Sequence, residues 1–65
     1  MRCVNVAEVF DEVRAENDAG FLADCWNVAA KFEISNRLAG NLLGILRRSG
    51  RISGDGVRGY RIVPP

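Results

Sequence analysis

The sequence predicts a small α+β domain in which three helices precede an antiparallel β-hairpin. Three segments place apolar residues at helical spacing, and each lies between residues that commonly begin and end helices. The last segment instead alternates polar and apolar residues on either side of a glycine-rich stretch, which is typical of a hairpin. A chain of 65 residues buries only about 60% of its unfolded surface. We therefore expect residues 1–65 to form one domain with one modest core.

The first predicted helix begins after Asn5 and runs to about Asn17, where Ala19-Gly20 interrupts the pattern. Asn5 is the predicted N-cap, and Glu8 is placed to return a hydrogen bond to it, as in a capping box. The apolar stripe of this helix consists of Val6, Val9, Phe10 and Val13. The opposite side carries acidic residues at i, i+4 spacing, which we expect to face solvent: Glu8, Glu12 and Glu16.

The second predicted helix covers about 24–32, with Asp24 as its N-cap. Phe21-Leu22, just before it, is predicted to be a short third strand. Trp26 lies in the first turn near Phe21 and is expected at the core or its edge. The alternative role for Trp26 is a stacking platform for an unpaired base.

The third predicted helix covers about 36–48, from Ser35 as N-cap to a stop at Ser49-Gly50. Its apolar side consists of Leu38, Ala39, Leu42, Leu43, Ile45 and Leu46. Its polar side consists of Asn36, Arg37, Gly40, Asn41, Gly44, Arg47 and Arg48. Gly40 and Gly44 lie near the middle of that polar side, although glycine in a helix costs roughly 0.8–1 kcal/mol relative to alanine. The two glycines permit close approach to DNA, permit packing of a partner helix, or are neutral.

The hairpin is predicted over residues 51–63. Its strands are Arg51-Ile52-Ser53 and Tyr60-Arg61-Ile62-Val63, joined by a flexible tip over 54–59. Tyr60 is expected to pack at the base of the hairpin, the alternative being contact with a nucleic-acid backbone. Arg58, at the tip, is the side chain that we expect to contact a minor groove or a phosphate.

Two segments resemble the winged helix-turn-helix superfamily. They are Val28-Ala29-Ala30-Lys31-Phe32-Glu33-Ile34-Ser35 and Leu46-Arg47-Arg48-Ser49-Gly50-Arg51-Ile52. Glu33 departs from the family pattern, which has glycine at that turn position. We therefore expect either a less comfortable backbone conformation at Glu33 or a slightly different turn. The resemblance implies a recognition helix over 36–48, a wing over 51–63, and binding of nucleic acid.

The distribution of charge agrees with a polyanionic partner. Residues 1–30 hold two basic and six acidic residues, a net charge of −4, whereas residues 31–65 hold seven basic and two acidic residues, a net charge of +5. The basic half contains the third helix and the hairpin. Such an asymmetry indicates a surface for a polyanion, the alternative being an ordinary solvated surface.

Several classes of function are not expected. The chain has no histidine, the commonest general base and metal ligand, so we expect no enzyme, cofactor or metal site. Cys3 and Cys25 lack CxxC spacing, and Cys25 is expected to be a small, half-buried side chain. No apolar run approaches the roughly 20 residues that span a bilayer, and no signal peptide is apparent. We expect a cytoplasmic protein, associated with the nucleoid if it comes from a bacterium, an archaeon or a phage.

The expected function is binding of double-stranded DNA by a small transcriptional regulator or accessory protein. Arg37 and Asn41 are expected near base edges, because arginine pairs with guanine and asparagine with adenine. The other predicted DNA-binding residues are Asn36, Gly40, Gly44, Arg47, Arg48, Arg51, Arg58 and Arg61. The alternative is a protein interaction module that uses the Gly40/Gly44 face or the acidic face of the first helix. Besides DNA, the candidate partners are a second copy of the chain, in a homodimer, or another protein, and no dimerisation helix is evident in the sequence.

Overall fold

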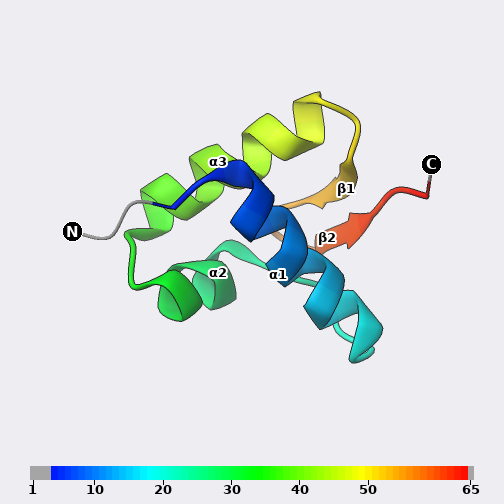
Figure 1. Ribbon diagram of the computed structural model, residues 1–65, viewed down its shortest axis with the longest axis horizontal. Coiled ribbons are helices and arrows are strands. Elements are labelled where there is room, and N and C mark those ends of the chain that lie inside the picture. The colour runs from blue at the N-terminus through cyan, green and yellow to red at the C-terminus, as the bar shows by residue number, and fades with distance from the viewer. Residues whose placement is uncertain (1–3, 65) are drawn as a thin grey trace.

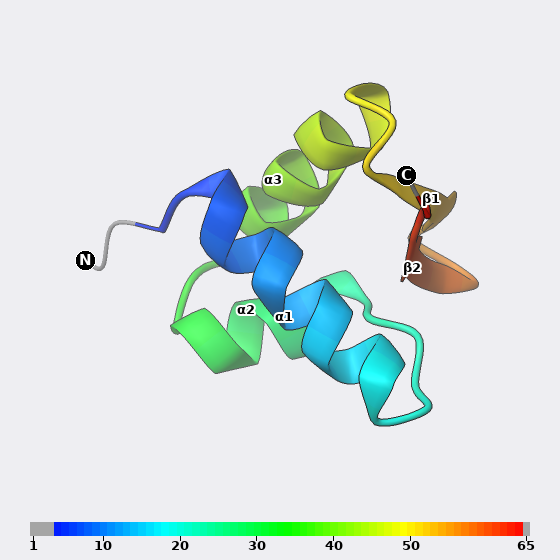
Figure 2. The same ribbon diagram turned by 45° about the vertical axis from the view of Figure 1, so that its right-hand side comes forward.

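The computed structural model describes residues 4–64, and Cys3 lies outside them. Three helices precede one hairpin, as predicted (Figure 1): α1 (Val6–Asp18), α2 (Cys25–Phe32), α3 (Asn36–Arg48), β1 (Ile52–Asp55) and β2 (Gly59–Ile62). α1 packs against α3 and β2, and α2 packs against α3. The α2–α3 turn and the hairpin lie at opposite ends of α3 (Figure 1, Figure 2).

Each helix begins at the predicted N-cap, whose side chain accepts a hydrogen bond from the amide three residues later. The distances are 2.9 Å at Asn5, 2.8 Å at Asp24 and 3.1 Å at Ser35. The capping box expected of Glu8 is wrong. Its Oε2 is buried and has no hydrogen-bond partner among residues 4–64. Capping therefore comes from the three N-cap side chains alone.

The turn between α2 and α3 keeps its tight geometry despite the glutamate. Glu33 has φ 56° and ψ 46°, the left-handed conformation that favours glycine. Its N–H donates to the Ala29 carbonyl, which also accepts from the Ile34 amide at 3.0 Å. A non-glycine residue there costs roughly 1–2 kcal/mol. The packing of α2 on α3 outweighs this cost, so the turn is strained and not reshaped.

The core draws on every element. Its buried apolar residues are Val9, Val13, Ala23, Val28, Ala29, Phe32, Ala39, Leu42, Leu43, Leu46, Ile52 and Tyr60. Tyr60 packs at the hairpin base as predicted, and Cys25 is half-buried as predicted.

Two predictions about the core are wrong, for the same geometric reason. Trp26 is 67% exposed and Ile45 is 45% exposed. At about 100° per residue, each lies roughly 110° around its helix from the middle of the buried face. Phe21, expected beside Trp26 near the core, is also exposed, at 65%.

The hairpin is more regular than its glycine content suggests. Its strands pair in antiparallel register from Ile52↔Ile62 to Asp55↔Gly59, so the predicted strand bounds were wrong and the connection is only 56–58. A β-carbon at Gly54 would collide with the Gly59 carbonyl oxygen. Asp55 Oδ1 accepts from the amides of Val57 at 2.9 Å and Arg58 at 2.7 Å. The glycines therefore allow a tight connection, and the Asp55 carboxylate holds it by these two hydrogen bonds.

The third strand is a single bridge. Ala23, one residue beyond the predicted Phe21-Leu22, exchanges two hydrogen bonds with Tyr60. The Ala23 amide donates to the Tyr60 carbonyl at 3.1 Å, and the Tyr60 amide donates to the Ala23 carbonyl at 2.6 Å.

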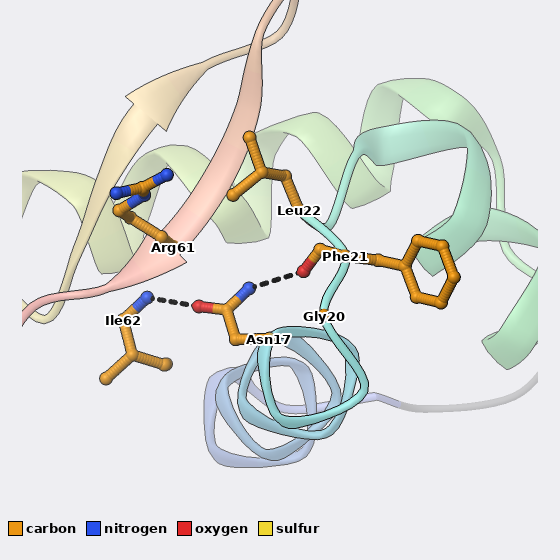
Figure 3. Close-up of a pocket in the computed structure, with 6 residues that line it drawn as sticks. All are labelled: Asn17, Gly20, Phe21, Leu22, Arg61 and Ile62. Carbon is orange, nitrogen blue, oxygen red and sulfur yellow. Dashed lines mark hydrogen bonds between the residues drawn. The ribbon is translucent and has the colours of Figure 1, made fainter.

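Asn17, in the last turn of α1, lies along the same edge of β2 (Figure 3). Its Oδ1 accepts from the Ile62 amide at 2.7 Å, and its Nδ2 donates to the carbonyls of Phe21 at 3.0 Å and Tyr60 at 3.3 Å. An asparagine side chain thus replaces part of a strand and fixes the hairpin to α1.

Candidate nucleic-acid interface

The exposed face of α3 is centred on two arginines. The buried residues of α3 are Ala39, Leu42, Leu43 and Leu46. Arg37 and Arg48 lie almost opposite them, about 20° apart around the axis and roughly 16 Å apart along it. Both are exposed, as is Asn41 beside them. Gly44 lies near the middle of this face, as predicted, but Gly40 lies closer to its edge. Asn36 and Arg47 occupy that same edge, where both are exposed.

Packing within the described chain does not require glycine at position 40 or 44 of α3. A β-carbon at Gly40 or Gly44 would meet nothing within 4 Å. Alanine would fit at both positions and favour the helix. Packing inside the domain therefore does not explain the glycines, and the bare strip that they leave lies beside Arg37 and Arg48.

Arg58 at the wing tip and Arg47 near the C-terminal end of α3 both act on the carboxyl group of Asp55. Hydrogen bonds from the amides of Arg58 and Val57 hold the pKa of the Asp55 carboxyl below its ordinary value. The positive charges of Arg58 and Arg47 lower that pKa in the same direction. Because this influence requires proximity, Arg47 of α3 and Arg58 of the wing both lie near the Asp55 carboxylate. Val57, beside Arg58, is 96% exposed.

Two predicted residues lie elsewhere. Arg51 lines a hollow with Phe10 and Arg14 of α1. Arg61 lines a second hollow with Asn17 and Phe21, at the end of α1 and in the loop that follows. The structure thus places the seven predicted residues along α3 with Arg58 of the wing near the C-terminal end of that helix, and it groups Arg51 and Arg61 with α1.

The acidic row of α1 is not the freely solvated face that was expected. Glu8, Glu12 and Glu16 are all half-buried. Burial raises the pKa of Glu12, a hydrogen bond with Glu16 raises it further, and the charge of Lys31 in α2 opposes the rise. The acidic row therefore interacts with Lys31 of α2. Throughout residues 4–64, no arginine forms an ion pair with a carboxylate.

Asn17 is the structurally important residue that sequence analysis missed. A signal was present, because Asn17 follows Val13 at i+4 and so puts an amide where the apolar stripe of α1 would continue.

Within the described part of the chain, no cluster of three histidine, cysteine or acidic side chains could hold a metal ion. No helix in that part is long and apolar enough to cross a membrane. No protein-family model, curated protein or solved structure matches the chain.

Proposed function

We propose that this protein binds double-stranded DNA, with α3 in the major groove and the hairpin as a wing on the backbone or minor groove. The observation that carries the proposal is the set of exposed arginines on α3, which are Arg37, Arg47 and Arg48, with the exposed Arg58 of the wing near the C-terminal end of the same helix. An α-helix fits the major groove, which is about 12 Å wide. Exposed guanidinium groups bind phosphates by releasing condensed counterions from the duplex.

The geometry suggests a division of roles along α3. Arg37 and Asn41, on the outermost side of the helix, face the base edges. Arg47, Arg48 and Arg58 hold phosphates on either side of the groove. Gly44 allows the helix backbone to come closer to the groove than a side chain would permit. The domain would act by binding and not by catalysis, as a small cytoplasmic or nucleoid-associated regulator or accessory protein.

A pair of matched charge reversals tests this proposal. Arg48→Glu on α3 and Arg14→Glu on α1 change the net charge equally, and both side chains are exposed. In a fluorescence-anisotropy titration with a labelled generic duplex, Arg48→Glu should weaken binding by more than about tenfold, or 1.4 kcal/mol. Arg14→Glu should change it little, because Arg14 lies on α1 over the Phe10 ring and not on α3 or the wing tip. Equal losses in the two variants would mean that net charge alone attracts the duplex and that α3 is not the interface.

A further inference from the structure

A second surface runs along α1 and shares no residue with α3. Phe10, Arg14 and Asn17 follow one another at i, i+4 and i+7, so they share one side of α1. Two hollows of about 300 and 350 Å³ open along this side, and Ile62 at the end of β2 lines both. We call these two adjoining hollows the α1–β2 groove. Each is at the lower end of the size of pockets that hold small ligands, so each could accept one large side chain.

Among the residues that the structure describes, all the charged side chains of the α1–β2 groove are basic. They are Arg14, Arg51 and Arg61, and no acidic residue of 4–64 lines either hollow. The Arg14 guanidinium carbon lies 5.5 Å from the centre of the Phe10 ring, within the range of a cation–π contact. This contact holds one charge over the apolar floor of the groove. The groove therefore favours an anionic partner.

The apolar part of the groove distinguishes a peptide from a nucleic acid. Phe21 is 65%, Leu22 40% and Val63 38% exposed, and all three line the hollows. Figure 3 shows Asn17 between the loop and β2, with Arg61 and Ile62 on one side of it and the Phe21 ring turned outward on the other. A phosphodiester backbone would pair with the arginines but would leave these apolar side chains uncovered. Large apolar side chains of a peptide would cover them.

The edge of β2 restricts how a peptide can bind. Tyr60 already pairs with Ala23, and the Ile62 amide already donates to Asn17 Oδ1. A partner therefore does not add to this edge as a further strand, and recognition has to come from side chains.

We propose that the α1–β2 groove binds an acidic peptide segment of a partner protein, with two large apolar side chains in the hollows and flanking carboxylates on Arg14, Arg51 and Arg61. The groove shares none of its arginines with the exposed face of α3. The domain therefore holds a protein through α1 and β2 while α3 stays accessible. This inference does not depend on the ligand of α3.

Short fluorescein-labelled synthetic peptides test the proposal. Each carries two leucine or phenylalanine residues flanked by aspartate and glutamate, by serine or by lysine. Acidic peptides should bind in anisotropy titrations at moderate salt, serine-flanked peptides at least about tenfold more weakly, and lysine-flanked peptides not at all. Replacing the two apolar residues by alanine should also remove binding. If no acidic peptide binds, or if the alanine peptide binds equally well, the groove does not have the proposed role.

Protein variants locate the binding site. Arg61→Glu and Arg14→Glu should each weaken the acidic peptides about tenfold or more, whereas Arg37→Glu, the matched control on α3, should leave them within about twofold. All three side chains are exposed, so the fold should persist. A larger loss with Arg37→Glu would place the peptide on α3 and refute the inference. Displacement of bound peptide by a DNA duplex, with amide shifts over 61–63, would show that the groove contacts nucleic acid instead.

Discussion

Replacing Asn17 by alanine should loosen the hairpin without disturbing α3. The Asn17 side chain makes three hydrogen bonds to backbone groups of the 20–22 loop and β2, at 2.7, 3.0 and 3.3 Å. Alanine removes all three and leaves the Ile62 amide without its partner. Since β2 carries Tyr60 into the core, these bonds connect the wing to the helical part of the domain.

The expected loss of stability follows from these bonds. Each of the two shorter bonds contributes about 0.5–1.5 kcal/mol net, and the longest one less. Alanine returns roughly 0.5 kcal/mol through its higher helix propensity. The free energy of unfolding should therefore fall by about 1–2 kcal/mol, which lowers the Tm of a domain of this size by roughly 4–16 °C.

Thermal unfolding and amide hydrogen exchange measure the two consequences separately. Asn17→Ala should lower the Tm and reduce the protection of the Ile62 amide, while amides in the middle of α3 lose protection only with global stability. Asp18→Ala is the matched control, because Asp18 is the exposed neighbouring residue and should leave the Tm almost unchanged. A loss below about 0.5 kcal/mol, or an Ile62 amide as protected as before, would refute the role given to Asn17.

Three further predictions concern α3, the wing and α1. Gly40→Ala and Gly44→Ala should each stabilise the free domain by about 0.5–1 kcal/mol but weaken duplex binding in anisotropy titrations. Unchanged duplex binding would mean that the glycines have no role in binding. Loss of self-association in place of duplex binding would favour a protein interface. Arg37→Ala should relax sequence preference by about 1–3 kcal/mol, whereas Arg58→Ala should weaken specific and random duplexes alike; equal effects of both on both duplexes would contradict these roles. Burial raises the pKa of Glu12 in the folded protein. The contribution of Glu12 to the free energy of unfolding is therefore fully present below its ordinary pKa of 4.5, and it is lost as the pH rises through the pKa of the folded state. Glu12→Gln should therefore raise the Tm at neutral pH and reduce its pH dependence, and a Tm equal to the parent's at every pH would contradict this origin.

Local signals in the sequence predicted the helices accurately. Asn5, Asp24 and Ser35 cap their helices as expected, and the predicted bounds of α3 agree with the structure. Capping depends on residues within one turn, so neighbouring sequence is sufficient to identify it. The left-handed conformation of Glu33 is one of the two alternatives that the family resemblance offered for this turn, and the local sequence alone did not decide between them.

Features that depend on tertiary packing were harder to predict. Trp26 and Ile45 are apolar, but each lies just outside the buried face of its helix, and the exact orientation of a helix is set by its neighbours. The sequence gives no sign that Arg51 and Arg61 face α1 while Arg58 joins α3, because strand register and twist decide where each side chain points. The candidate site on α3 was therefore predictable from one helix, and the α1–β2 groove was not.

The salt dependence of duplex binding tests the central proposal most directly. Arg37, Arg47, Arg48 and Arg58 offer three to four phosphate contacts, since Arg37 faces the bases. Log affinity should then fall against log salt with a slope of about −3 to −4. The measurement is a series of anisotropy titrations with one duplex at increasing salt concentration. A slope near zero, or no binding to any duplex at roughly 50 mM salt, would contradict the assignment of α3 and the wing as a DNA-binding surface.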